Sequence, residues 1–526
     1  MAMGRAFIPH LGLQNDECLF ANGIFKPYAV TYVAQIGHSR LPLMLMSYLG
    51  TLKSWMYRPI FQFFGTGTGA VREPMVLAGA AGLWLFFQFL RRAAGYRAAI
   101  LGCGLLAADS LYLLTICFDW GPVAMQHLML LGGISLLLGF YQERDPRRLF
   151  WGWFLLGLGM WDKALMIWML AGMGVAVLAL YVREILGVFS WRRLAISVLG
   201  FLLGALPLVV YNVDQKFITF RGNASYETGN IAGKARLLQA TADSRALFGW
   251  LVNEDWQTPA PHAPKGVVQS ASARISALTG RQRHNWMVYA FVLALLLTPF
   301  AGAARRAILF ALITMAVAWL QMAVTANAGG SVHHAILIWP LPEMVIAISF
   351  AAASRRLKRA GLPALAVVLA VMMASGLLVT NEYFYLMIRN GGGQNWTDAI
   401  YALSRYLEGT QAGNIFCMDW GMMDSLRLLH RGKLPLRVGT DPISKKSLTD
   451  DDRTMLGKQI SEPDHLFINH TKDWEFFQGV NDRLVAYASE AGYRREVLAT
   501  IPDEYGRNVY EVYHFVRGQG PGAGGR

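Results

Sequence analysis

The chain has 526 residues, of which 54% are hydrophobic and only 16% are charged, and its mean hydropathy is +0.33. Because charged residues make up about a quarter of an ordinary soluble domain, this composition excludes a purely soluble protein and favours an integral membrane protein. The net charge of +14 would suit a nucleic-acid partner, so its distribution along the chain matters.

Most of the positive charge lies in five short segments between apolar stretches. Together they hold fifteen Lys and Arg against three acids, and they are residues 91–97, 143–148, 182–193, 304–306 and 354–359. The short loops at the opposite ends of the apolar stretches carry one Lys and no Arg. This asymmetry is the positive-inside pattern of cytoplasmic loops. The charge therefore predicts membrane topology, and it argues against nucleic acid as a partner.

The first segment, residues 1–73, contains an acidic pair, Asp16 and Glu17, ahead of the first credible span. Residues 41–65 are rich in Leu, Met and aromatic side chains but include Lys53, Arg58 and Pro59. That mixture predicts one or two helices lying in the membrane interface. The charge asymmetry places residues 1–73 on the outer face, so we expect one further span upstream.

Apolar stretches of near-spanning length predict about ten transmembrane helices within residues 74–387. Their expected positions are 74–91, 98–118, 122–141, 149–162, 163–182, 194–212, 286–303, 307–325, 335–353 and 362–386. The fourth and fifth meet at Asp162-Lys163, which predicts a helical hairpin with its turn there. The long segment 213–285 is then an outer loop.

Residues 388–516 read as a separate, water-soluble domain on the outer face. Helical spacing in 395–410, 422–432 and 480–493 alternates with strand-like runs such as 414–420 and 464–470, which predicts a small α/β layer. The glycine-rich end, 517–526, is predicted to be disordered. Four cysteines are too few for a disulfide scaffold, although a bridge between Cys18 and Cys417 stays open.

Four stretches carry a resemblance to a known superfamily. They are NDECLFANG (15–23), the Leu-rich segment from Leu41 to the Arg72-Glu73-Pro74 entry of the first span, LLAADSLYLLTICFDWGPVAMQHL (105–128) and GLGMWDKALMIW (157–168). In this order they resemble the GT-C superfamily of membrane glycosyltransferases. The similarity is greatest to the branch related to protein O-mannosyltransferases (glycosyltransferase family 39) and lipid A aminoarabinose transferases. The hairpin departs from the family's Thr-Lys-Gly turn, since it has Asp162-Lys163-Ala164.

The resemblance implies an enzyme of the cytoplasmic membrane that works at the outer face. It would transfer a sugar from a polyprenyl-phosphate-linked donor to a hydroxyl of a protein, lipid or glycan acceptor. Asp16 would be the general base of a single displacement, because the acceptor oxygen must lose a proton as it attacks. Glu17 would orient Asp16 or raise its pKa. The alternative is that both acids are simply solvated in an outer loop.

Other candidates for substrate binding are Asp119, Lys163, Arg58 and Arg72. Lys163 is expected to meet the lipid phosphate, with a salt bridge to Asp162 as the alternative. Asp119 could bind a divalent cation or the acceptor, or could simply stabilise a turn. His333 and His334 are weak metal candidates, since adjacent histidines rarely share one ion.

Two other functions remain open from the sequence. A transporter or flippase for a lipid-linked or small substrate would also be polytopic, but such proteins usually combine paired repeats with a midplane site. We find no internal repeat, and the candidate acids lie in outer loops. A non-catalytic homologue would look the same in sequence.

Overall fold

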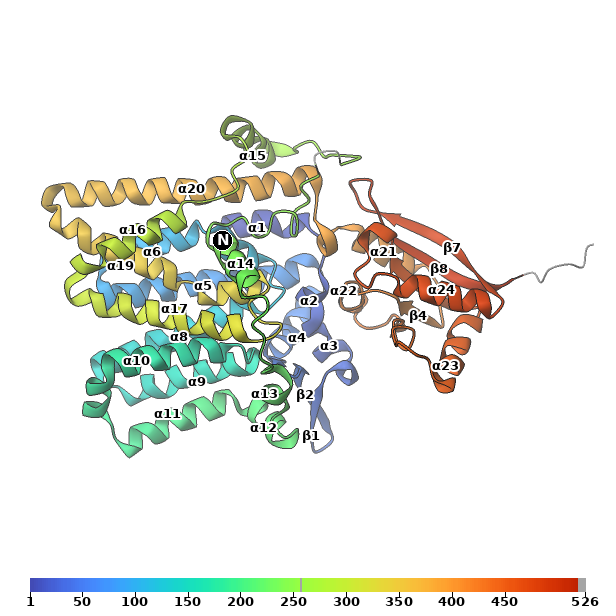
Figure 1. Cartoon of the computed structure of the whole chain (residues 1–526), viewed down its shortest axis with the longest axis horizontal. Helices are drawn as coiled ribbons and strands as arrows, with labels where there is room; N and C mark the ends of the chain where they lie inside the picture. The colour runs from blue at the N-terminus through green and yellow to red at the C-terminus, as the bar shows by residue number, and fades with distance from the viewer. Residues whose placement is uncertain (256–257, 519–526) are drawn as a thin grey trace, which may run out of the picture. The chain divides into compact units, whose positions relative to one another are not determined.

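The computed structural model describes residues 1–255 and 258–518 of the chain. It divides into two compact units. The first unit consists of Met1–Pro9, Lys26–Phe248 and Lys265–Tyr385, and the second consists of His10–Phe25, Gly249–Pro264 and Leu386–Arg526. Figure 1 shows long helices running side by side in the first unit and a sheet flanked by short helices in the second.

The first unit is built almost wholly from helices. Its long or paired helices are α5 (Thr68–Ala94), α6 (Tyr96–Ala107), α7 (Ser110–Cys117), α8 (Val123–Glu143), α9 (Pro146–Asp162), α10 (Met166–Val188), α11 (Trp191–Gly204), α12 (Leu206–Asp214), α16 (Met287–Leu297), α17 (Arg305–Val324), α19 (Leu341–Arg356) and α20 (Gly361–Asn390, through Tyr385). Shorter helices are α1 (Ala2–Phe7), α4 (Leu52–Phe64), α13 (Ile218–Asn223), α14 (Ile231–Ala242), α15 (Gly266–Thr279) and α18 (Val332–Ala335).

Six helical segments among the described residues are long and apolar enough to cross a membrane, or up to eight if two bent pairs are counted. The bent pairs are α6 with α7, at 61°, and α11 with α12, at 75°. One of the six, Met287–Val324, is interrupted at Thr298–Ala304, and α9 has only 17 residues. Helices thus occupy all ten predicted positions. The number of helices that cross the membrane, and the side of the membrane on which each helix end lies, stay predictions.

The N-terminal part of the first unit corrects one expectation. Residues 41–50 do not form an interfacial helix, because β2 (Ser39–Met46) pairs with β1 (Tyr32–Ile36) and β3 (Leu49–Gly50) in an antiparallel sheet. A two-residue turn with Gly37 at φ 60° joins β1 to β2, and Pro42 disfavours a helix through this run. The apolar composition hid the strand, and only α4 is helical as expected.

The second unit contains a five-stranded mixed sheet in the order β5-β4-β6-β8-β7. Its strands are β4 (Asn414–Cys417), β5 (Leu436–Val438), β6 (His465–His470), β7 (Tyr493–Pro502) and β8 (Asn508–Arg517). Its helices are α2 (Asn15–Cys18), α3 (Asn22–Phe25), α21 (Ala399–Glu408), α22 (Met423–Leu429), α23 (Asp450–Ser461) and α24 (Val480–Glu490).

The core of this sheet follows from the alternation of its strands. Ile415 and Cys417 of β4 pack with α21 and α22 in one buried cluster, whereas Phe416 packs with α23 and α24 in another. The predicted α/β layer is therefore confirmed, with α23 and β5 as additional elements. The compact unit is wider than residues 388–516, because it includes two segments from elsewhere in the chain.

Two further predictions concern a disulfide bridge and the glycine-rich end of the chain. Cys18 and Cys417 are both buried and form no disulfide, so the bridge left open by the sequence is not formed. The predicted disorder of 517–526 concerns mostly residues 519–526, which lie outside the described part of the chain.

Candidate functional site

The turn between α7 and α8 is held by a buried ion pair. Lys53 of α4 donates from Nζ to Oδ2 of Asp119 at 2.9 Å and to the carbonyl of Asp119 at 3.3 Å. The backbone N–H of Ala124 donates to the other carboxylate oxygen at 3.0 Å. Since both ionised side chains are almost fully buried, the pair is shielded from water. The sequence pattern did not single out Lys53 as a site residue, although a lysine in an apolar helix indicates a partner nearby.

The same turn also receives Lys163, so the structure brings two of the predicted residues together. Lys163 follows the end of α9 in extended conformation, and its Nζ donates to the carbonyl of Gly121 at 3.1 Å. Asp162 accepts from the side-chain amide of Gln126, at 3.2 Å. Lys163 also pairs through its backbone with Leu49 of β3. The predicted hairpin is thus present, and the small sheet fixes its turn.

His333 and His334 lie in α18 of the first unit. The indole N–H of Trp120 donates to Nδ1 of His333 at 2.8 Å, and the hydroxyl of Ser331 lies 2.7 Å from the same nitrogen. The two imidazoles are 4.3 Å apart, centroid to centroid. Within residues 1–255 and 258–518, no group of three or more His, Cys, Asp or Glu side chains is arranged to hold a metal ion. His333 and His334 therefore do not belong to a metal-binding group among the described residues, and the possible divalent cation stays a prediction.

The two predicted arginines have different environments. Arg72 of α5 is fully buried, donates to the carbonyl of Ile8 at 2.7 Å, and lies over the ring of Phe118 at 4.6 Å. These contacts suit a packing role better than a phosphate contact. Arg58 of α4 is exposed. Arg72 therefore meets the turn that holds Asp119 at its first residue, Phe118.

Asp16 and Glu17 belong to the second unit, in the single turn of α2. Gln14 caps this turn by accepting from the N–H groups of Asp16, at 2.7 Å, and Glu17, at 3.1 Å. The carboxylate of Glu17 completes a capping box with the N–H of Gln14 at 3.4 Å, and it is 1% exposed. Asp16 is only half-buried. Of the two acids, Asp16 is therefore the more accessible to a substrate.

A network from α22 holds the segment that carries this acidic pair. The carboxylate of Asp424 accepts from Asn22, at 3.0 Å, and from Arg427, at 3.1 Å. Asn15 caps the start of α22 by accepting from the N–H of Asp424 at 2.9 Å, and Ser425 donates to the carbonyl of Leu13 at 2.8 Å. Burial raises the pKa of Asp424, and these donors partly offset the effect. No sequence pattern indicates this pairing, since about 400 residues separate the partners.

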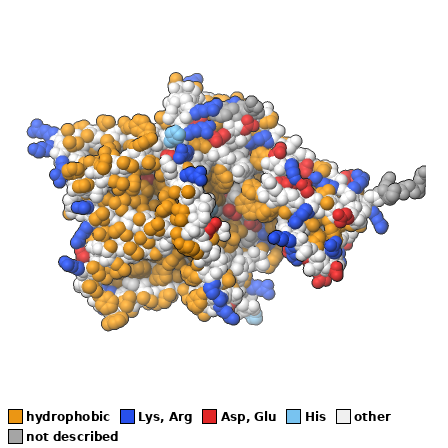
Figure 2. Space-filling model, viewed as in Figure 1, with side chains coloured by type: hydrophobic (Ala, Val, Ile, Leu, Met, Phe, Trp, Pro, Cys, Tyr) orange, Lys and Arg blue, Asp and Glu red, His pale blue; other side chains and the backbone are white. Residues whose placement is uncertain are grey.

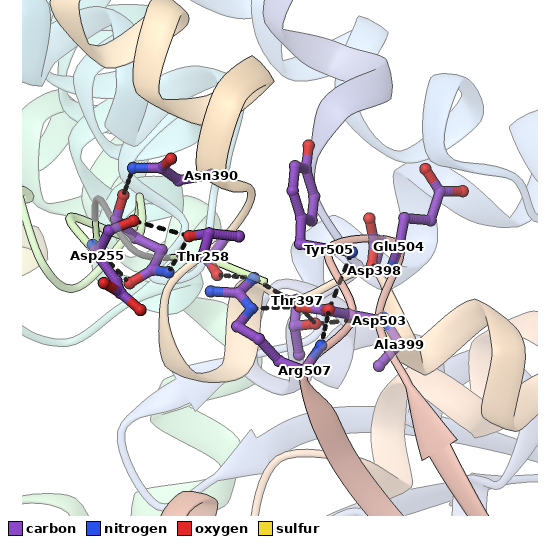
Figure 3. A network of polar contacts seen from close by, with 12 residues as sticks. Asp255, Thr258, Asn390, Thr397, Asp398, Ala399, Asp503, Glu504, Tyr505 and Arg507 are labelled. Atoms are coloured by element: carbon purple, nitrogen blue, oxygen red, sulfur yellow. Dashed lines mark hydrogen bonds and ion pairs between the residues drawn. The ribbon is translucent and has the colours of Figure 1, made fainter. Parts of the chain in front are cut away.

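A second polar network in the second unit joins the loop before α21 to the turn between β7 and β8 (Figure 3). Arg507 donates to Asp503 at 2.6 Å and to the carbonyl of Gly392 at 3.1 Å. Asp398 accepts from the N–H of Glu504 at 3.0 Å. Burial, together with the charges of Asp503 and Glu504, raises the pKa of Asp398 to about 6. The network stabilises two loops and has no nucleophile–base pair of its own.

Comparison with known proteins gives a likeness of fold. No family model matches the sequence, and no curated protein matches it. The structure is similar to ArnT from Cupriavidus metallidurans bound to undecaprenyl phosphate, with a TM-score of 0.59, 13% identity, and coverage of 97% of this chain and 96% of that one.

The structure is also similar to the oligosaccharyltransferase of Archaeoglobus fulgidus, with a TM-score of 0.51 and 10% identity. The match covers 98% of this chain and 72% of the oligosaccharyltransferase. The structure of AglB from the same organism, in complex with an inhibitory peptide and a dolichol-phosphate, is similar with a TM-score of 0.50 and 10% identity. The match covers 98% of this chain and 71% of AglB. Identities this low establish the fold alone. The structural neighbours are members of the GT-C superfamily, as the motifs predicted, and this chain has their fold.

Proposed function

We propose that the protein is a GT-C-type glycosyltransferase that takes a sugar from a polyprenyl-phosphate-linked donor. The observation that carries the proposal is the likeness of nearly the whole chain to ArnT, whose structure contains undecaprenyl phosphate. The apolar helices support an integral membrane protein that can meet such a lipid. The outer face of the cytoplasmic membrane and a protein, lipid or glycan acceptor belong to the same proposal.

Asp16 is the proposed general base. Its carboxylate would accept the proton of the acceptor hydroxyl while that oxygen attacks the anomeric carbon. The bond from that carbon to the phosphate oxygen breaks in the same step, and the polyprenyl phosphate leaves with the bonding electrons. The capping role of Glu17 supports a positioning function for that residue and leaves the proton transfer to Asp16.

Lys163 is the proposed contact of the leaving phosphate, because a cation that is already held in place stabilises charge as it develops. Its carbonyl partner Gly121 and the backbone pairing with Leu49 support a fixed position. The carboxylate of Asp119 accepts hydrogen bonds from Lys53 and from the N–H of Ala124, which supports a role in positioning the turn. Arg58 and Arg72 remain weaker phosphate candidates.

The test is a transfer assay of the full chain in nanodiscs, with extracted polyprenyl-phosphate sugars and total cell-envelope acceptors. Asp16→Asn should lower turnover at least about a hundredfold, which is the usual contribution of a general base. Asp473→Asn is the matched control, since it removes the charge of an exposed aspartate in the same unit and should leave turnover unchanged.

Full activity of Asp16→Asn would exclude it as the base. If the wild type transferred no sugar from any donor, the glycosyltransferase proposal would fail. Lipid movement across vesicle bilayers would then test the flippase alternative directly.

A further inference from the structure

An open cavity of about 620 Å³ lies in the first unit, apart from the turn that holds Asp119. Residues of α5, α8, α9, α10, α17 and α19 line it. The lining of α10 runs from Leu170 to Val188 across a kink at Tyr181, and its part from Leu170 to Tyr181 alone spans about 16 Å along the helix axis. A cavity of this length reaches well into the hydrocarbon region of a bilayer about 30 Å thick.

The cavity has an apolar interior and a polar mouth. Its interior is formed by aliphatic and aromatic side chains, among them Phe89, Ile134, Leu170, Phe310 and Met344. The ionised residues that line it are Arg92, Arg144, Glu184 and Arg306. All four lie at helix ends next to the basic connecting segments. Figure 2 shows Lys and Arg side chains along the left edge of the helical unit, beside hydrophobic ones.

The mouth keeps a positive charge after its ion pairs are considered. Arg306 pairs with Glu184 at 2.5 Å, and Arg92 pairs with Glu143 at 3.2 Å. Arg144 follows the end of α8, and its guanidinium lies over the ring of Tyr141 at 5.3 Å. Within the described residues, no carboxylate lies within ion-pair distance of Arg144. Arg144 is exposed, so its charge can meet an anion from outside.

We propose that this cavity binds one anionic phospholipid, with an acyl chain in the apolar interior and the phosphate at Arg144. A soluble anion would gain nothing from the long apolar interior, and an uncharged lipid would gain nothing from the cationic mouth. Basic pockets between transmembrane helices on the cytoplasmic side are known sites for acidic headgroups. The positive-inside pattern places the mouth on that side, where anionic lipids are abundant.

The proposal concerns a second lipid site and does not depend on the transferase activity. The bound lipid would fill space between α10 and α8, which the protein itself leaves open. It would thereby stabilise the packing of the helices that line the cavity.

The test is native mass spectrometry of the full chain in detergent, titrated with dioleoylphosphatidylglycerol or dioleoylphosphatidylcholine. We expect the anionic lipid to bind about tenfold more tightly, which corresponds to one charge-assisted contact. Arg144→Gln should remove most of this preference. Arg147→Gln, which removes an exposed neighbouring cation outside the cavity lining, should keep it.

A second pair of variants tests the apolar interior. Gly174 lines the cavity, and a Cβ at that position would meet no atom within 4 Å. Gly174→Leu should therefore obstruct part of the cavity and lower binding of both lipids about tenfold, because the leucine side chain takes space and apolar contacts from the acyl chain. Gly187→Leu, on the same helix but outside the lining, should leave binding unchanged.

Three results would overturn the proposal. They are equal binding of the two lipids, equal effects of Arg144→Gln and Arg147→Gln, and retained binding in Gly174→Leu. Binding of a polyprenyl phosphate by this cavity in preference to phosphatidylglycerol, lost in Gly174→Leu, would also contradict it.

Discussion

The ammonium of Lys53 lies 2.9 Å from Oδ2 of Asp119, and their side chains are only 6% and 1% exposed. Removing one partner of such a pair leaves the other charge buried and uncompensated. The position of the turn at Asp119 therefore depends on Lys53, even if neither residue touches a substrate.

Replacing Lys53 with Met should lower the free energy of unfolding by about 3–5 kcal/mol. The double variant Lys53→Met/Asp119→Leu should lower the free energy of unfolding clearly less, because neither charge of the pair is left buried alone. Both can be measured by thermal unfolding in detergent. Arg5→Met is the control, since the Arg5–Glu73 pair is partly exposed and should contribute about 0–1 kcal/mol. Equal losses for Lys53→Met and Arg5→Met would contradict the assignment.

The contacts of Arg427 lead to a second prediction, within the second unit. Arg427→Met leaves the buried carboxylate of Asp424 with fewer donors, so the segment 10–25 should open more often. Hydrogen–deuterium exchange of peptides covering residues 11–23 should rise severalfold, while peptides from β6 stay protected. Arg405→Met, at an exposed position of α21, is the matched control. Unchanged exchange in residues 11–23 would show that Arg427 does not hold the segment.

The sequence alone was sufficient to locate helices and strands wherever the signal lies within a short stretch of the chain. Hydropathy over about 20 residues located helices at all ten expected positions, because a span must be apolar along its whole length. The strand-like runs 414–420 and 464–470 likewise predicted β4 and β6 of the second unit. Residues 41–50 were misread because Leu and Met are as common in helices as in buried strands, and the pairing with β1 is not a local property.

The candidate site was predictable only in part. Motif resemblance selected Asp119 and Lys163, and the structure brings both to one turn. The motif resemblance gave no information on Lys53, whose role depends on its contact with Asp119, 66 residues away. It was also silent on Asp424, which binds Asn22 across 402 residues. Such pairs depend on tertiary packing, which a single sequence does not encode in any short pattern.

Asp398 allows a third prediction, about pH. Its pKa is raised from an ordinary value of 3.8 to about 6, so the folded chain holds a proton that the unfolded chain releases. Stability should therefore fall as the pH rises from about 4 to about 6, and level off above that. Asp398→Asn removes this penalty while keeping an oxygen for the N–H of Glu504.

The measurement for Asp398 is the difference in melting temperature between Asp398→Asn and wild type from pH 4 to pH 7.5. We expect the difference to grow up to about pH 6 and then stay constant. Asp473→Asn, at an exposed position, should give a flat difference. A flat profile for Asp398→Asn as well would mean that its carboxyl is not perturbed in the folded chain.

The fourth prediction concerns the close contact of α9 with α11. A Cβ at Gly204 would lie 2.1 Å from the carbonyl oxygen of Phe154, and one at Gly157 would lie 2.2 Å from that of Phe201. Gly200 and Gly204 form a Gly-x-x-x-Gly pattern, which lets helix backbones approach closely in a membrane. Gly204→Ala should therefore force the helices apart and lower the free energy of unfolding by about 1–3 kcal/mol.

Gly187→Ala on α10 provides the comparison for Gly204→Ala, because a Cβ there would meet no atom within 4 Å. That substitution should be neutral or stabilise the protein by up to about 1 kcal/mol, since alanine favours a helix over glycine. Thermal unfolding of both variants in the same detergent separates the two effects. If Gly204→Ala matched Gly187→Ala, the two backbones would not need to touch, and lipid could separate α11 from α9.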